Sequence, residues 1–147
     1  MNNARALNYL GLARRGNNIV IGEEPVGAAC RSSHARLLIL AQDAADNTFR
    51  RVRHFADAGQ CLWISVPFTK EELGFAVGRT SCAMLGVTDI GFAEAIAKKL
   101  AALDSEKFTQ TAEQLAVKAQ RAAQRRKEQQ SHEKNVRAGG KKRSAKK

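Results

Sequence analysis

The chain has 147 residues, which is room for one domain with a core of its own and an appendage. It carries 25 Lys and Arg against 14 Asp and Glu, a net charge of +11, but this charge is unevenly spread. Residues 1–104 hold 12 basic and 10 acidic side chains, whereas residues 105–147 hold 13 and 4. The body is therefore close to neutral, and the C-terminal segment is a polycation.

A polycation of this kind favours a polyanionic partner, most often nucleic acid. A membrane surface is excluded as the partner because Phe108 and Leu115 are too few to anchor the segment in lipid. No stretch approaches the roughly 18 apolar residues of a membrane span, and the N-terminus lacks the apolar run of a signal peptide. We therefore expect a cytoplasmic protein.

Short apolar runs alternate with helical patterns along the body. In chain order, the sequence predicts a helix over residues 4–15, a strand over 19–21, a helix over 23–31, a strand over 37–41, a helix that ends before Gly59, a strand over 61–65, a helix over 69–77, a strand over 82–87 and a helix over 91–103. This order predicts one α/β domain, a three-layer α/β/α sandwich around a four-stranded mixed sheet. We expect Asp43, or Asp46 with Asn47, to cap the third helix.

Beyond residue 104 the pattern changes. A thin alanine-rich stripe marks an otherwise charged helix that runs to about residue 130; its members are Phe108, Ala112, Leu115, Ala119 and Ala122. We predict a domain over residues 1–104, a charged helical extension over 105–130 and disorder over 131–147, where polarity prevents burial from offsetting the entropy of ordering. The stripe leaves open whether the extension packs on the body or on a partner.

No set of residues suited to catalysis emerges. The three histidines lack a nearby pair of carboxylates, and the chain has no nucleophile elbow, phosphate-binding loop or dinucleotide-binding glycine motif. Cys30, Cys61 and Cys82 are odd in number, lack zinc-ligand spacing and lie among apolar neighbours, so we interpret them as reduced core residues. We expect no enzyme activity, no metal and no cofactor.

The most informative feature is the point where the strand over residues 19–21 stops at Gly22 and a helix begins directly. The first N–H groups of a helix have no acceptor within it, and Gly22 lets another molecule approach closely. Pro25 suits the first turn, where its missing N–H has no cost. Glu23 and Glu24 fit the positive end of the helix dipole, which is the structural alternative to a ligand site. Against nucleic acid, these carboxylates would repel phosphate and accept hydrogen bonds from base N–H groups instead.

Four segments carry a resemblance to a known family. They are Leu-Gly-Leu-Ala-Arg-Arg at 10–15, Gly22-Glu23 after its strand, the strand at 37–40 followed by Asp43-Ala44, and Lys-Glu-Glu-Leu-Gly-Phe-Ala-Val-Gly at 70–78. In this order they resemble the kink-turn-binding ribosomal protein superfamily (the ribosomal protein seven-Ae type) and, within it, the bacterial YlxQ-like branch. The resemblance covers about residues 5–100. It implies an α/β/α sandwich that binds a sharply bent RNA internal loop with tandem sheared G·A pairs.

The resemblance also implies two sets of RNA-binding residues. In such proteins the helix after the strand–Gly turn reads guanines in a widened groove, and the loop after the Leu-Gly-x-Ala-x-Gly helix covers a flipped-out nucleotide. Carried over, the first set is Gly22, Glu23, Glu24, Pro25, Ala28 and Arg31, and the second is Arg79, Thr80 and Ser81. The ribosomal members have Asn-Glu in place of Glu24-Pro25, a lysine in place of Ala28 and apolar residues in place of the second set. The chain therefore lacks one cation beside phosphate and one backbone donor.

We thus expect a monomeric, non-catalytic protein that binds structured, kink-turn-like RNA, ribosomal or ribosome-associated, with affinity added by the basic tail. The alternative is a general polyanion-binding protein whose tail binds DNA or RNA without sequence specificity. The two differ in competition, because binding at a site survives an excess of unrelated duplex and tail-driven binding does not.

Overall fold

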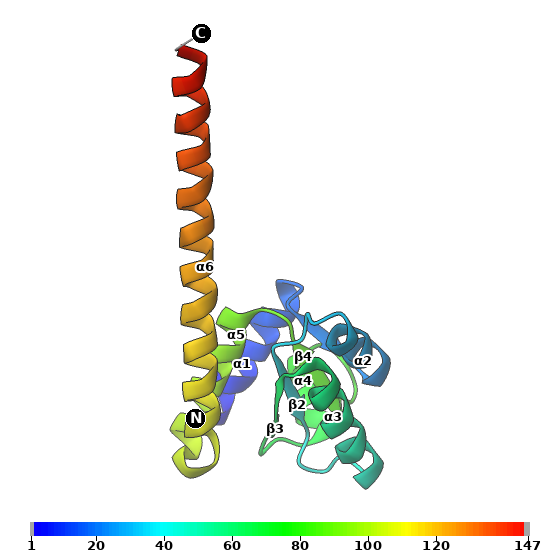
Figure 1. Cartoon of the computed structure of the whole chain (residues 1–147). Coiled ribbons are helices and arrows are strands. Elements are labelled where there is room, and N and C mark those ends of the chain that lie inside the picture. The colour runs from blue at the N-terminus through cyan, green and yellow to red at the C-terminus, as the bar shows by residue number, and fades with distance from the viewer. Residues whose placement is uncertain (1, 146–147) are drawn as a thin grey trace.

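The computed structural model describes residues 2–145 of the chain and the side chains of residues 4–131. Helices and strands alternate through the body, and a long helix follows (Figure 1). The elements in chain order are α1 (Asn2–Arg15), β1 (Ile19–Ile21), α2 (Glu23–Arg31), β2 (Leu37–Leu40), α3 (Asp46–Gly59), β3 (Leu62–Ser65), α4 (Lys70–Ala76), β4 (Met84–Val87), α5 (Ile90–Leu103) and α6 (Ser105–Ala145). Every predicted element of the body is present, and the ends differ by up to two residues.

The four strands form one mixed sheet in the order β1-β4-β2-β3. β2 runs parallel to β3 and antiparallel to β4, which in turn runs antiparallel to β1. The fully apolar strand β2 is central, as predicted, and all four of its residues are buried. The prediction of a mixed sheet is confirmed.

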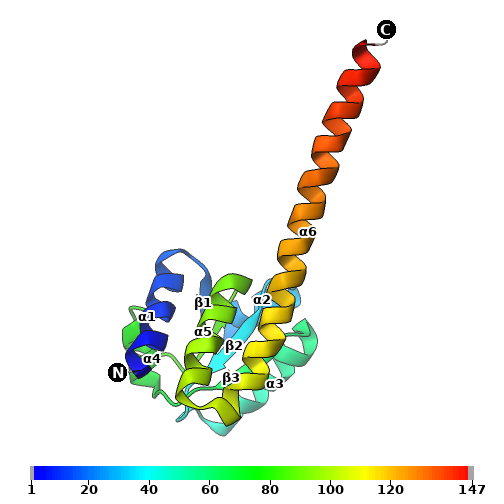
Figure 2. The same cartoon turned by 90° about the vertical axis from the view of Figure 1, so that its left-hand side faces the viewer.

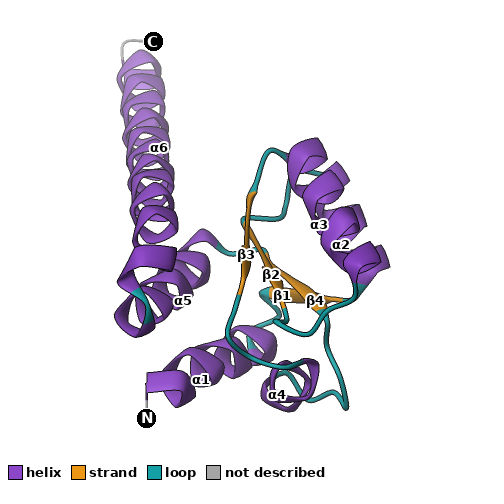
Figure 3. Ribbon diagram, turned by 90° about the horizontal axis from the view of Figure 1, so that it is seen from below, coloured by secondary structure: helices purple, strands orange, loops and turns teal. Residues whose placement is uncertain are grey.

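Helices cover both faces of this sheet (Figure 3). α2 and α3 lie on one face, and α1, α4 and α5 lie on the other. Successive side chains of a strand point to opposite faces, so Leu38 and Leu40 pack in the core under α2 and α3, whereas Leu37 and Ile39 pack in the larger core on the other side. The three-layer sandwich predicted from the sequence is therefore present.

The helix-cap prediction for α3 is wrong. α3 follows Ala45, and no side chain caps it, although Asp46 and Asn47 lie in its first turn. Asp43 instead accepts a hydrogen bond at 2.8 Å from the backbone N–H of Lys70, the first residue of α4. The reason is topological, because the chain leaves the parallel neighbours β2 and β3 at the same edge of the sheet. Because Asp43 and Lys70 are 27 positions apart in the sequence, local sequence patterns could not predict this contact.

α6 begins as part of the body and then leaves it (Figure 2). Phe108, Ala112 and Leu115 are buried in the core that α5 and α1 share, so the first turns of α6 pack on the body. This answers the question that the alanine-rich stripe left open. The hydrophobic core therefore extends past residue 104, the expected end of the domain.

The remainder of α6 is described as a helix to Ala145, and the disorder expected over residues 131–147 stays a prediction. Residues 146–147 lie outside the described part of the chain. No helix among the described residues is long and apolar enough to cross a membrane.

Candidate nucleic-acid interface

The turn at Gly22 joins β1 to α2 in a conformation that glycine favours. Gly22 has φ 97° and ψ 164°, which strains any residue with a Cβ. Its N–H donates to the Met84 carbonyl at 3.0 Å, and its own carbonyl accepts from the N–H of Val26 at 3.1 Å. The turn thus ties the end of β1 to the start of β4 and fixes where α2 begins. Glu23 and Glu24 occupy the first turn of α2, as predicted.

The two glutamates have different surroundings. Arg51 Nη1 of α3 lies 2.7 Å from Glu23 Oε2, and both side chains are partly exposed, at 61% and 39%. An ion pair of this exposure contributes about 1 kcal/mol or less. Glu24 is exposed and belongs to neither of the two ion pairs found among the described side chains. Of the two carboxylates, Glu24 is therefore the one open to a partner.

The exposed side of α2 carries the rest of the first set. Pro25 and Ala28 are both exposed, and Ala28 lies one turn beyond Glu24 on the same side of the helix. Both also line a shallow depression of about 620 Å³ against the end of β4. Arg31 is exposed too, but it is the last residue of α2 and lies about 12 Å from the Gly22 end at 1.5 Å per residue. Arg31 is thus separated from the turn.

The second set lies in the loop that follows α4. The loop folds back on its helix, because the Arg79 N–H donates to the Gly74 carbonyl at 2.7 Å and the Cys82 N–H donates to the Lys70 carbonyl at 2.9 Å. A Cβ at Gly74 would lie only 2.7 Å from the backbone nitrogen of Ser81. The glycine therefore permits this close approach, which gives the Leu-Gly-x-Ala-x-Gly pattern a physical reason. The loop residues Arg79, Thr80 and Ser81 are all exposed.

The two sets meet at a small hollow. A cavity of about 130 Å³ is lined by Ile21, Gly22, Glu23, Thr48, Ser81, Cys82, Ala83 and Met84. Gly22 and Glu23 from the first set therefore lie beside Ser81 from the second, although they are far apart in the sequence. We use the name turn surface for Gly22 to Pro25 with Ala28 and Arg79 to Ser81, all of which are exposed apart from the half-buried Gly22 and Glu23.

Three residues of this region were not singled out from the sequence. Arg51 pairs with Glu23, and Thr48 lines the hollow, so α3 borders the turn surface. Phe75 of α4 has a side chain that is 89% exposed, the largest value among the exposed large apolar residues. Helical periodicity could have predicted this exposure. Leu73 and Val77 are four residues apart and lie on the buried side of the helix, so Phe75, midway between them in the sequence, lies on the opposite side.

The described residues hold no cluster of metal ligands, and their cysteines are buried or partly buried. No group of three or more His, Cys, Asp or Glu among them could hold a metal ion. Cys30 and Cys82 are buried and Cys61 partly so, as expected for core cysteines. Burial raises the pKa of the Cys61 thiol to about 12 and that of Cys82 to about 11, so these thiols are neutral at physiological pH.

Comparisons with known proteins give two relatives in sequence. The chain is 36% identical over 88 residues to the RNA-binding protein YlxQ of Bacillus subtilis (strain 168), which covers 57% of this chain and 83% of that protein. It is 30% identical over 97 residues to the RNA-binding protein YlxQ of Enterococcus faecium, with coverages of 63% and 88%. No protein-family model matches the chain.

The fold also resembles those of solved structures. A protein of unknown function from Bacillus halodurans C superposes with a TM-score of 0.62 at 31% identity, over 66% of this chain and 97% of that chain. The Giardia lamblia 15.5kD RNA binding protein superposes with a TM-score of 0.54 over 71% of this chain and 88% of that chain. Its identity of 16% makes this a likeness of fold alone.

Proposed function

The chain belongs to the YlxQ family, and from this membership we propose that it binds structured RNA through the turn surface. Both relatives are named for RNA binding and not for a reaction, which agrees with the prediction that the chain is not an enzyme. The observation that carries the proposal is the hollow at which Gly22 and Glu23 meet Ser81, because two segments with family-like patterns converge there.

The chemistry of the turn surface favours contact with bases near the turn and with phosphate at its margins. The exposed Glu24 carboxylate repels phosphate and accepts hydrogen bonds from base N–H groups, such as the amino groups of guanine, cytosine and adenine. Arg31 at the end of α2 and Arg79 in the loop after α4 are both exposed, and their guanidinium groups suit phosphate. Phosphate contacts then hold the RNA while Glu24 discriminates between bases.

We further propose that the RNA is a sharply bent internal loop with tandem G·A pairs, in ribosomal or ribosome-associated RNA, bound by a monomer in the cytoplasm. This follows the family resemblance of the two segments. The exposed ring of Phe75 adds support, because α4 carries both this ring and the loop proposed to cover a flipped-out nucleotide. A base stacked on an aromatic ring contributes about 1–3 kcal/mol.

The alternative is a general polyanion-binding protein, which is favoured by the 13 basic residues beyond residue 104. A competition titration distinguishes binding of structured RNA at the turn surface from general polyanion binding by the tail. Labelled bent-loop RNA is bound to the full chain, and an unlabelled straight duplex of unrelated sequence is added in rising excess. The proposed function predicts that a 100-fold excess leaves most of the labelled RNA bound, whereas tail-driven binding predicts its displacement.

A further inference from the structure

The side of α6 that faces the body changes character where the helix leaves it. Phe108 and Leu115 are buried against α5, and from Lys118 onward basic residues line the body-facing side of the helix beside the partly buried Ala119 and Ala122. Lys118, Arg121 and Arg125 recur at spacings of three and four, which places them on one side of the helix. The side that first buries apolar groups thus presents cations above the edge of the body.

The body supplies the opposite wall. A groove of about 570 Å³ lies between α6 and the starts of β2 and β3; it is lined by Ser33, Ala35, Arg36, Gly59, Gln60, Cys61, Ile90, Lys118, Arg121, Ala122, Arg125 and Arg126. We call this the basic groove. It holds five cations, all with exposed side chains, and no acidic residue lines it. Neither of the two ion pairs among the described side chains involves these five residues.

The basic groove lies at the opposite end of the strands from Gly22 and Ser81, although Arg36 also lines the depression that Pro25 and Ala28 share. Gly22 is bonded to Met84 at the start of β4, and Met84 pairs with Leu40 at the end of β2. Arg36, in contrast, directly precedes the start of β2. The four residues of β2 separate the two ends by about 13 Å at 3.3 Å per residue. A ligand in the basic groove is therefore not the part of the RNA that meets Gly22.

We propose that the basic groove is a second RNA-binding site, which holds the phosphate backbone of a helical RNA segment without reading its bases. The inference rests on the proposed function for RNA as the partner. From Lys118 to Arg126 the helix wall is about 12 Å long, which matches several successive phosphates and not a single phosphate group. Arginine forks suit phosphate, and a polyanion relieves the mutual repulsion of the five cations.

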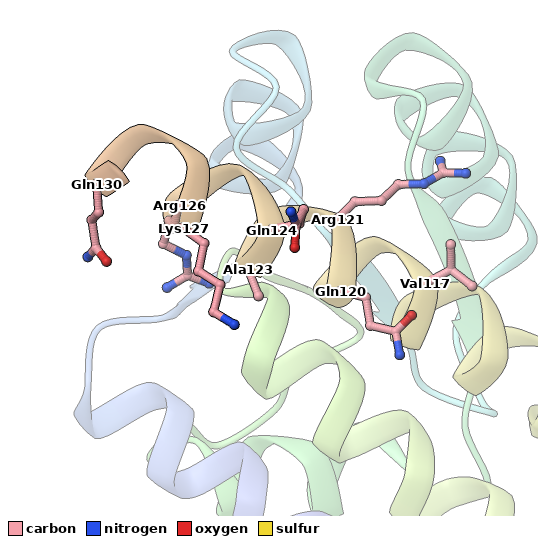
Figure 4. A pocket seen from close by; sticks show the side chains of 8 residues that line it. All are labelled: Val117, Gln120, Arg121, Ala123, Gln124, Arg126, Lys127 and Gln130. Atoms are coloured by element: carbon pink, nitrogen blue, oxygen red, sulfur yellow. The ribbon is translucent and has the colours of Figure 1, made fainter. Parts of the chain in front are cut away.

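The test compares variants that remove the same charge inside and outside the groove. The groove variant is Lys118→Gln with Arg121→Gln, and the control is Lys107→Gln with Lys127→Gln on the same helix. Lys107 and Lys127 do not line the groove. Figure 4 shows Arg121 and Lys127 pointing to different sides of α6. Glutamine has nearly the helix propensity of the residues it replaces, so both variants should fold.

Binding of a straight RNA duplex is measured from low to high salt, and the slope of log affinity against log salt is compared. Each lost phosphate contact lowers the slope by about 0.7–0.9, so the groove variant should lower it by about 1.5 and the control by much less. Arg36→Gln tests the body wall and should lower the slope by about 0.8. Equal slopes for the groove variant and the control, or an unchanged slope for Arg36→Gln, would overturn the proposal.

The bent-loop RNA is titrated in the same series. If the wild-type chain shows no preference for the bent loop over the duplex, the proposed function is contradicted. The proposal for the basic groove is tested separately, by the salt dependence of duplex binding alone. The groove variant should retain the wild-type ratio of bent-loop to duplex affinity at matched salt if the two sites are separate.

Discussion

Gly74→Ala should displace the loop of residues 79–81 and weaken RNA binding while the chain stays folded. The added Cβ would lie 2.7 Å from Ser81 N and 2.9 Å from the Arg79 carbonyl oxygen. These are backbone atoms, so the loop itself must move by about 0.7 Å to bring the shortest separation from 2.7 to 3.4 Å, where ordinary contact begins. Such overpacking costs about 1–3 kcal/mol. Replacing glycine within a helix returns about 1 kcal/mol, so the net loss of stability is about 0–2 kcal/mol.

If the loop supplies one contact to a base, its displacement should lower affinity for bent-loop RNA by about ten-fold or more and leave affinity for a straight duplex unchanged. Fluorescence anisotropy with both RNAs gives the affinities, and urea unfolding gives the stability. Gly91→Ala is the control for a helical Gly→Ala change away from the loop; its Cβ would lie 3.1 Å from Asp89 Oδ2, a side-chain oxygen that caps α5 through the Phe92 N–H and must shift by about 0.3 Å to reach ordinary contact. A folded Gly74→Ala variant with wild-type affinity for the bent loop would refute the role of the loop.

Four further predictions concern single residues. Ala28→Lys places a cation on the exposed side of α2, so titration should show a gain of roughly ten-fold for bent-loop RNA and a smaller one for duplex; equal gains would argue against this docking mode. Phe75→Ala should weaken bent-loop binding by about 1–3 kcal/mol without loss of stability in urea, and an unchanged affinity would remove the proposed stacking. Phe108→Ala should destabilise the chain by about 3–5 kcal/mol in urea unfolding, whereas Val117→Ala, at an exposed position, should cost less than about 0.5 kcal/mol; similar losses would contradict the packing of α6. Because burial raises the pKa of Cys61 from 9.0 to about 12, folding favours the neutral thiol, and the resulting stabilisation is complete below pH 9 and is lost as the pH rises towards 12. Alkylation at pH 8, followed by mass spectrometry, should therefore be slower at Cys61 in the native chain than in urea, and equal rates would contradict its burial.

The sequence was sufficient to predict the layers of the fold because the spacing of its apolar residues clearly distinguishes helices from strands. The apolar run of β2 indicated a central strand, and Gly22 with Pro25 marked the start of α2. The resemblance of about residues 5–100 to a known family then supplied the two candidate RNA-binding segments. Local pattern and composition are enough for inferences of this kind, because each depends on neighbours within one element.

The errors and omissions concern contacts between distant residues. Asp43 bonds to Lys70 and not to α3, because β2 and β3 are parallel neighbours. The salt bridge from Arg51 to Glu23 likewise depends on how α3 packs beside α2. The basic groove forms only because the first turns of α6 dock on the body, which brings Arg36 opposite cations that follow it by more than eighty positions. No spacing in the sequence encodes these pairings.

The most direct test of the account is the identity of the RNA bound in cells. The full chain is crosslinked to RNA by ultraviolet light in living cells, recovered, and the attached RNA is sequenced, with the crosslinked peptides mapped by mass spectrometry. The account predicts enrichment of a few structured sites that contain a bent internal loop, with crosslinks in the peptides that hold residues 22–28 and 79–81. A diffuse spread over unrelated RNA, with crosslinks confined to α6, would contradict it.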